Sequence, residues 1–233
     1  MRKLSILKKI IILVLILALP GFLYYLLTVK GKNRYHALTV FGPKQVAKTS
    51  HKVNGKDVPD TIYHTLPAFS LLNQEGQKVS DNSLVNRITV VDFFYTRCPN
   101  ICSQMNKSLD SLASEYAGNK LIQFVSITVD PAYDTQQVLK KYSDQYKVPA
   151  SKWLFLTGDT SVIYPLARTG FLVNAVKAGN EDFIYSDKII LIDGGKRIRG
   201  YYSATVSDEF DRLDNEIKVL LSEELMKNNT LEY

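Results

Sequence analysis

The only two cysteines of the 233-residue chain, Cys98 and Cys102, lie four residues apart directly after an apolar run. At this spacing in a helix both sulfurs fall on one face, with the α-carbons about 6 Å apart and within disulfide range. A thiol near a helix N-terminus ionises more easily than a free cysteine, because the helix dipole favours the thiolate. The pair can therefore form a reversible disulfide or bind one soft metal ion.

Other roles for the cysteines fit the sequence less well. Buried cysteines also act as small hydrophobic side chains, but a pair separated by Pro99 directly after an apolar strand is unusual for that role. The chain lacks the second cysteine pair and the nearby histidine that a zinc knuckle would require. The histidines His36, His51 and His64 precede or begin the folded domain, and we expect them to be solvated.

The cysteines are predicted to lie at a strand-to-helix turn. The run Val90–Tyr95 is apolar, β-branched and aromatic, as in a strand covered on both faces. Pro99 is favoured in the first turn of a helix. Apolar residues then recur at helical spacing at Met105, Leu109, Leu112 and Tyr116.

The rest of the domain alternates predicted strands with predicted helices. Further strands are expected at 67–72, 78–80, 121–129, 153–157, 189–193 and 198–202, and further helices from a capping box at Asp134 and Gln137, at 160–169, and from Ser207. This order predicts an α/β, thioredoxin-like fold with a central mixed sheet. The cysteine turn then lies at the carboxyl end of a central strand, where ligand sites of α/β folds form.

The N-terminal segment predicts a transmembrane anchor. Residues 10–29 carry no charge and are about long enough to cross a bilayer as a helix. The basic residues before them favour a cytoplasmic N-terminus. A cleaved signal peptide is the alternative, but the bulky residues from Phe22 to Leu27 provide no small-x-small cleavage site. In both cases the domain lies on the extracytoplasmic, periplasmic-type side, where disulfides are permitted.

The charge distribution makes nucleic acid a poor candidate partner. The formal net charge is +6, but four of the basic residues lie within the first nine, so the remainder is nearly balanced. We expect a cytoplasmic N-terminus at 1–9, a transmembrane anchor at 10–29, a polar tether at 30–61, the folded domain at 62–227 and a C-terminal tail at 228–233.

The cysteine motif and two later segments resemble one known family. The segment FFYTRCPNIC, residues 93–102, resembles the metal-binding signature of the SCO/SenC family, whose members are thioredoxin-like, membrane-anchored copper-binding proteins. The segments VSITVDPAYDT at 125–135 and WLFLTGD at 153–159 are similar to further family segments. The resemblance runs from about residue 66 to residue 221. It implies that Cys98 and Cys102 bind copper and that the protein assists assembly of a respiratory cytochrome oxidase.

One position departs from the family pattern. Family members add a distal histidine as the third copper ligand, and the corresponding residue in FIYSDKIILID is Tyr185. Many relatives also have proline at the position of Ser103. Two thiolates suffice for Cu(I), whereas Cu(II) prefers an added nitrogen, and a neutral phenol is a poor ligand at neutral pH. We therefore expect a copper ion bound as Cu(I) rather than Cu(II), with ligation by the Tyr185 tyrosinate left open.

Three functions remain compatible with these residues. The first is a copper metallochaperone that passes copper from Cys98 and Cys102 to a respiratory oxidase subunit or another copper or thiol protein. The second is a thiol-disulfide oxidoreductase, in which one cysteine attacks a partner's disulfide and the other resolves the mixed disulfide. The third is a docking module with a structural disulfide. The resemblance favours the metallochaperone, whereas Tyr185 favours the oxidoreductase, so whether the chain is an enzyme stays open.

Overall fold

The structure is a computed structural model that describes residues 6–26, 37–53, 55–98, 101–173, 175–178, 182–185, 187–203 and 205–230. Within these ranges, nothing is stated for the side chains of residues 6, 7, 10, 101, 102, 175–178, 182–185 and 228–230. The chain divides into two compact units, residues 1–36 and residues 37–233.

The first unit contains a single described helix, α1 (Ile6–Tyr25), with Pro20 inside it. Its apolar side chains are exposed, among them Leu17 and Phe22. Among the described residues, no helix combines the length and the apolar character that a membrane crossing requires.

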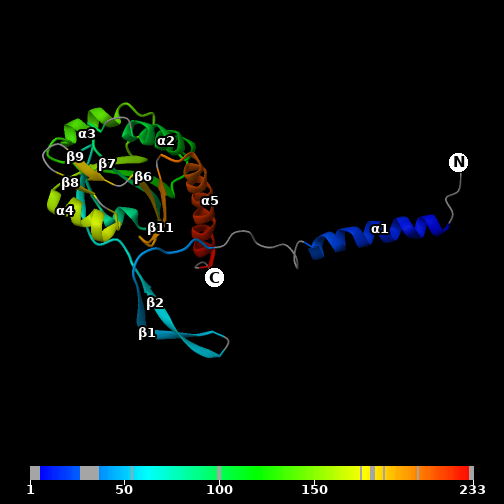
Figure 1. Cartoon of the computed structure of the whole chain (residues 1–233). Coiled ribbons are helices and arrows are strands. Elements are labelled where there is room, and N and C mark those ends of the chain that lie inside the picture. The colour runs from blue at the N-terminus through cyan, green and yellow to red at the C-terminus, as the bar shows by residue number, and fades with distance from the viewer. Residues whose placement is uncertain are drawn as a thin grey trace. The chain divides into compact units, whose positions relative to one another are not determined.

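The second unit is built on a seven-stranded mixed sheet with the order β11-β10-β5-β6-β7-β3-β4 (Figure 1). The strands are β3 (Ser70–Asn73), β4 (Lys78–Ser80), β5 (Ile88–Phe94), β6 (Ile122–Thr128), β7 (Trp153–Thr157), β10 (Lys188–Ile192) and β11 (Ile198–Ser203). The three central strands β5, β6 and β7 are parallel, and the flanking pairs are antiparallel. This arrangement confirms the predicted α/β fold with a central mixed sheet.

Helices cover both faces of this sheet (Figure 1). They are η2 (Asp81–Leu84), α2 (Ile101–Glu115), α3 (Gln136–Ser143), α4 (Thr160–Pro165), the π-helical η3 (Leu166–Gly170) and α5 (Ser207–Thr230). On one face, Leu109 of α2 and Leu213 of α5 share a buried cluster with Phe94. On the other face, Ile163 of α4 packs in a second cluster with Val91. Because successive strand residues point to opposite faces, β5 contributes side chains to both clusters.

The predicted helical stripe after the cysteines is confirmed. Met105, Leu109, Leu112 and Tyr116 are all buried, so this face of α2 packs on the sheet. The predicted helix at 160–169 differs, because it is α-helical only to Pro165 and then continues as a π-helix. Proline has no N–H to donate, which explains the change in hydrogen-bond pattern at this point.

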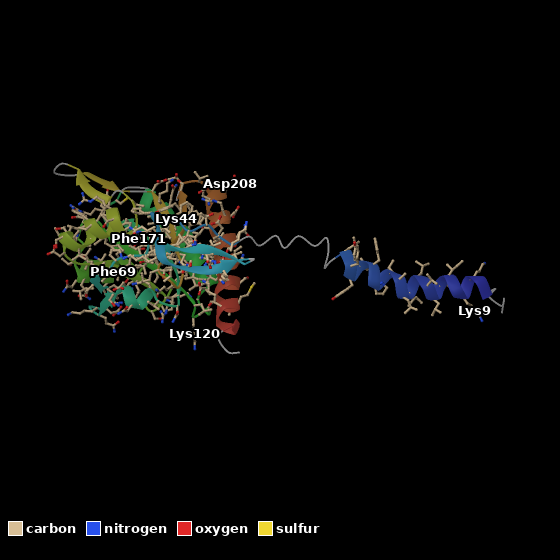
Figure 2. The ribbon with its side chains drawn as sticks, turned by 90° about the horizontal axis from the view of Figure 1, so that it is seen from below. Lys9, Lys44, Phe69, Lys120, Phe171 and Asp208 are labelled. Carbon is tan, nitrogen blue, oxygen red and sulfur yellow. The ribbon has the colours of Figure 1, made fainter. Side chains whose placement is uncertain are left out.

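The aromatic side chains at the second face come from distant parts of the chain. Phe171 contacts Phe93 edge to face, with the ring centres 5.4 Å apart. Phe69 belongs to the same cluster, and Figure 2 shows Phe69 and Phe171 within the folded unit. These contacts join the segment before β3 to the end of η3.

A correction concerns residues 30–61, which the sequence predicted to be a polar tether. The strands β1 (Lys44–Val53) and β2 (Lys56–Tyr63) form an antiparallel hairpin there, which projects from the rest of the unit (Figure 1). Gly55 has φ of +78° in the turn, and an Asn-Gly pair is a strong hairpin signal. We call residues 44–63 the hairpin arm.

A second short hairpin was also not predicted. The strands β8 (Ala175–Ala178) and β9 (Asp182–Tyr185) pair in antiparallel fashion before the chain enters β10. This pair forms a sheet of its own and places Tyr185 at the end of β9.

Candidate functional site

Cys98 lies just beyond the carboxyl end of the central strand β5, as the sequence predicted. The strand remains paired to its last residue, because the Val129 N–H donates to the Phe94 carbonyl at 2.8 Å. The chain then turns, and the Cys98 N–H donates to the Tyr95 carbonyl at 3.1 Å. The Cys98 side chain is half-buried and packs on the cluster beneath α2, α3 and α5. The sulfur is therefore held at the rim of the core.

Cys98 is disulfide-bonded, and no free cysteine is found among the residues that the structure describes. Cys102 lies in the first turn of α2, where the sequence placed it, but its side chain is outside the described residues. The pairing of Cys98 with Cys102 thus stays a prediction. Pro99, predicted in the first helical turn, also lies outside the described residues.

A buried carboxylate holds the start of the cysteine turn. Asp134 accepts a hydrogen bond from the Thr96 N–H at 3.1 Å, one from the Thr96 hydroxyl, and one from the Thr128 hydroxyl at 2.5 Å. Burial raises the pKa of Asp134, while the hydrogen bonds from Thr128 and Thr96 oppose that rise. We call these three residues the Asp134 clamp. It fixes the turn before Cys98 to the end of β6.

The role predicted for Asp134 in a capping box is wrong. The N-cap of α3 is Thr135, whose hydroxyl accepts from the Val138 N–H at 3.4 Å. The carboxylate of Asp134 is fully buried and points to Thr96 and Thr128 instead. Tertiary contacts thus replace the local capping interaction that the sequence suggested.

An ion pair borders the cysteine turn on its exposed side. The Arg97 guanidinium donates to Asp130 at 2.5 Å and lies 4.1 Å from the centre of the Tyr133 ring. The hydrogen bond to Asp130 raises the pKa of Arg97. The Arg97 side chain remains 55% exposed while Asp130 is nearly buried. A fixed cation next to Cys98 in sequence favours the thiolate form of the reduced cysteine.

A second buried carboxylate lies within β5 and was missed from the sequence. Asp92 accepts a hydrogen bond from the Ser126 hydroxyl, which in turn accepts from the Trp153 indole at 2.9 Å. Burial raises the pKa of Asp92 to about 7. Among the described residues, its other oxygen and the Asn106 side-chain oxygen have no hydrogen-bond partner. The signal in the sequence was a lone carboxylate inside the apolar run Val90–Tyr95.

The other candidate residues are placed as follows. Tyr185 pairs with Ala175 at the end of β9, but its side chain is outside the described residues, so its ligand role stays a prediction. His51 lies on the hairpin arm, 2.6 Å from Asp60, and His64 lies 2.7 Å from the Gly170 carbonyl. The structure therefore does not bring His51 or His64 to the cysteine turn, and His36 lies outside the described residues.

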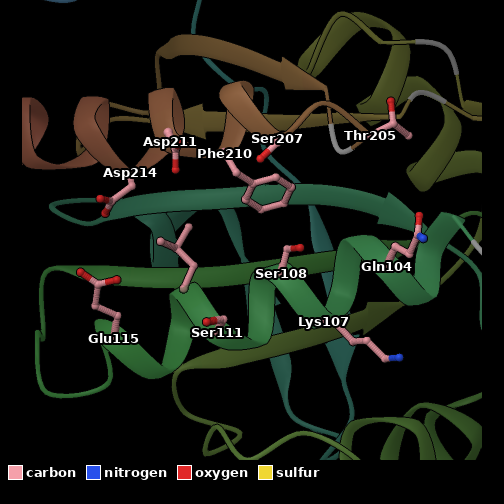
Figure 3. Close-up of a pocket in the computed structure, with 11 residues that line it drawn as sticks. Gln104, Lys107, Ser108, Ser111, Glu115, Thr205, Ser207, Phe210, Asp211 and Asp214 are labelled. Atoms are coloured by element: carbon pink, nitrogen blue, oxygen red, sulfur yellow. The ribbon is translucent and has the colours of Figure 1, made fainter.

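A groove of about 650 Å³ lies beside the cysteine helix, between α2 and the start of α5 (Figure 3). Leu112 and Phe210 supply its apolar lining. Hydroxyls and carboxylates form much of the rest, from Ser108, Ser111, Thr205, Ser207, Glu115, Asp211 and Asp214. Among the described residues, the lining of the groove includes no thiol or imidazole, and Gln104 at one end of it lies two residues after Cys102 in the sequence.

Comparison with known proteins matches residues 59–220 to the family model described as SCO1/SenC. The SCO1 protein homolog of Bacillus subtilis is 26% identical over 167 residues, which cover 70% of this chain and 86% of that protein. The match includes the cysteine turn, the Asp134 clamp and Asp92, but leaves out most of the hairpin arm.

Two solved structures share the fold. One is described as showing a disulfide switch in BsSco, a member of the Sco family of cytochrome c oxidase assembly proteins. It has a TM-score of 0.60 and 27% identity, and covers 66% of this chain and 92% of its own. The other is Arabidopsis thaliana ScoI with copper bound, with a TM-score of 0.56 and 25% identity over 65% of this chain and 97% of its own.

Proposed function

The chain belongs to the SCO1/SenC family, and from this premise we propose that it is a copper metallochaperone for a respiratory cytochrome oxidase. The observation that carries the proposal is the cysteine turn at the carboxyl end of β5, within the matched region. Similar proteins bind copper or are described as oxidase assembly proteins. Cys98 and Cys102 are the residues that would carry the copper ion as cargo.

The chemistry of the proposal requires the reduced cysteine pair. The Cys98 disulfide must first accept two electrons and two protons from an external dithiol, which is itself oxidised to a disulfide. The two thiols then lose their protons on binding copper, because thiolates are the ligands. Two sulfurs suit Cu(I), and transfer to the partner proceeds by exchange of one thiolate at a time for a ligand of the partner.

We propose that residues 10–29 anchor the domain to the membrane and that the domain lies on the extracytoplasmic side. The uncharged run is about long enough to span a bilayer, and basic residues precede it. Helix α1 covers most of this run, and its apolar side chains are exposed. A helix that exposes apolar side chains needs an apolar environment.

The thiol-disulfide oxidoreductase is the second candidate. It is supported by the disulfide bond of Cys98 and by the predicted correspondence of Tyr185 to the family's distal histidine. Cysteine exchange needs only the two sulfurs, so this activity does not depend on a third ligand. The exposed Arg97 would favour Cys98 as the attacking thiolate.

A deletion strain of the source organism tests the proposed function. Loss of the chain should lower cytochrome oxidase activity, and the native chain should restore it whereas Cys98→Ser should not. Added copper should restore part of the activity if the missing step is copper delivery. Recovery with an added thiol reductant, but not with copper, would instead support the oxidoreductase. Unchanged oxidase activity in the deletion strain would contradict both.

Substitution of Tyr185 tests the ligand set. Tyr185→His supplies the nitrogen that Cu(II) prefers, so we expect Cu(II) affinity to rise by at least about tenfold, with a thiolate-to-copper absorption band. Tyr185→Phe, the matched control, should leave Cu(I) affinity unchanged. Tight Cu(II) binding by the native chain that is lost in Tyr185→Phe would show that the tyrosinate is a ligand.

A further inference from the structure

The hairpin arm is a large element for which the SCO1/SenC match gives no role, because the match begins only at residue 59. Nearly every residue of β1 and β2 is exposed; only Ala47 and Asp60 are partly covered. An isolated two-stranded hairpin is marginally stable in water, and it presents unpaired strand edges. A surface that contacts the arm would therefore stabilise it.

The base of the arm is fixed to the domain. The Phe41 N–H donates to the Ile198 carbonyl at 2.9 Å, and the Phe41 ring contacts Tyr201 edge to face with the centres 5.5 Å apart. Just after β2, the His64 N–H donates to the Pro43 carbonyl at 3.2 Å and closes the base, and the Leu66 N–H donates to the Lys196 carbonyl at 3.0 Å. These contacts give the arm a defined direction relative to the sheet.

The base lies at the end of the sheet opposite the cysteine turn. The last residue of β10, Ile192, pairs with Thr89 near the start of β5, whereas Cys98 follows the end of β5. The turn after β10 leads to Ile198, where the arm is attached. The chain enters the domain at the same end, where Leu38 N–H donates to Glu223 at 2.9 Å.

The arm is cationic and partly apolar. Its lysines are Lys44, Lys48, Lys52 and Lys56, against two carboxylates, Asp57 and Asp60. Asp60 lies 2.6 Å from the His51 ring nitrogen, so part of its charge is already engaged within the arm. Among the described residues, no ion pair involves Lys48, Lys52 or Lys56.

Exposed apolar side chains accompany these lysines. Val46 is 76% exposed and Ile62 is 55% exposed, and Val53 at the end of β1 is also exposed. Lysines beside apolar side chains are typical of surfaces that contact the interface of an anionic bilayer. Lysines along a strand and Pro59 in β2 also disfavour addition of a partner strand to the arm.

We propose that the hairpin arm contacts the anionic headgroups of the membrane that holds the proposed anchor, an inference that rests on the anchor assigned under the proposed function. Only eleven residues separate α1 from residue 37, which span at most about 40 Å. The ten residues of β1 extend about 33 Å. These two lengths allow an arm at the chain-entry end to reach the bilayer surface.

The test uses the full chain in nanodiscs, one copy per disc, made of phosphatidylcholine alone or with phosphatidylglycerol. Amide hydrogen exchange in residues 44–63 should be slower in the anionic discs by at least about fivefold. Salt at 0.5 M should remove most of this difference, because it screens exposed charges. Lys48→Gln/Lys52→Gln should remove most of it as well. The matched control Lys107→Gln/Lys141→Gln, on α2 and α3, should retain it.

Equal exchange of the arm in the two lipids would overturn the proposal, as would protection that survives the Lys48→Gln/Lys52→Gln substitution. Protection that appears only when several copies share a disc would assign the arm to a second copy of the chain instead. Copper binding by the same samples is measured separately. If the arm exchanges equally in both lipids while copper still binds, only the role of the arm is overturned. If copper does not bind, the proposed function is contradicted instead.

Discussion

Two buried aspartates at opposite ends of the sheet are held in contrasting ways. At the cysteine end, Asp134 accepts hydrogen bonds from Thr96 and Thr128, and burial raises its pKa. At the chain-entry end, Asp193 is contacted by the guanidinium groups of Arg197 at 2.8 Å and Arg199 at 3.0 Å. Despite its burial, hydrogen bonds and charge from Arg197, with a hydrogen bond from Arg199, lower the pKa of Asp193.

The difference indicates separate roles for the two ends. Arg199 also forms an ion pair with Glu223 of α5 at 2.8 Å and donates to the Leu38 carbonyl at 2.7 Å. The arginine therefore links β11 to the last helix and to the segment where the chain enters the domain. In the Asp134 clamp the hydrogen bonds come from uncharged donors on Thr96 and Thr128, and they hold the turn that precedes Cys98. We infer that the charged end stabilises the fold, whereas the clamp positions the cysteines.

The largest effect on stability is expected at the charged end. Arg199→Met leaves Glu223 without its buried partner and removes one cation from Asp193, which should lower the free energy of unfolding by up to about 5 kcal/mol. Urea unfolding followed by fluorescence of Trp153, the only tryptophan, measures it. The control Lys218→Met breaks exposed pairs and should cost less than about 1 kcal/mol. Equal losses in the two variants would remove the distinction between the ends.

Asp92 is a third buried carboxylate; it accepts a hydrogen bond from the neutral Ser126 hydroxyl and, among the described residues, forms no ion pair. Its pKa is about 7 in the folded chain and near 4 in the unfolded chain, so the folded chain binds more protons between these values. The contribution of Asp92 to the free energy of unfolding is therefore fully present below pH 4 and is lost as the pH rises to about 7. Above pH 7 it no longer changes.

Asp92→Asn should therefore become more stable relative to the native chain as pH rises from 4 to 8. The expected change is on the order of 4 kcal/mol, from a pKa shift of about three units. Urea unfolding at several pH values measures it. A difference between the two chains that does not vary with pH would mean that Asp92 is not protonated at acidic pH in the fold as proposed.

Substitution in the Asp134 clamp should have the smallest effect on stability but should clearly lower the affinity for copper. Asp134→Asn keeps part of the hydrogen bonding to Thr96 and Thr128 and relieves the burial of a charge, so it should cost only about 1–2 kcal/mol. Because residues that orient ligands tune metal affinity, Cu(I) affinity should fall by roughly tenfold. Asp144→Asn, at an exposed pair with Lys140, serves as the control and should leave Cu(I) affinity unchanged. Unchanged affinity in Asp134→Asn would mean that the clamp does not position the cysteines.

Much of the fold followed from local patterns in the sequence. The apolar run that ends at Tyr95 and the helical stripe from Met105 determine a strand, a turn and a helix, and these positions are confirmed. The hairpin arm was missed because glycine, proline and polar residues outweighed its Asn-Gly turn signal. That signal, with Val53 before the turn and Val58 after it, was sufficient to predict the hairpin.

The clamp could not be predicted from local patterns. Thr96 lies in the turn after β5, Thr128 ends β6 and Asp134 lies in the loop before α3, and Asp134 satisfies a capping pattern equally well in the sequence. Only the pairing of β5 with β6 brings their side chains together. A carboxylate in an apolar strand, such as Asp92, is by contrast visible in the sequence and marks a buried polar contact.

We propose that Cys98 and Cys102 together bind copper, and anaerobic titration of the reduced full chain with Cu(I) against a Cu(I)-specific chromophoric chelator tests this pairing. Each native chain should bind one Cu(I) tightly, and both Cys98→Ser and Cys102→Ser should lose that binding. Absence of Cu(I) binding by the reduced, folded native chain would contradict the account. Undiminished binding in the double variant Cys98→Ser/Cys102→Ser would contradict it equally.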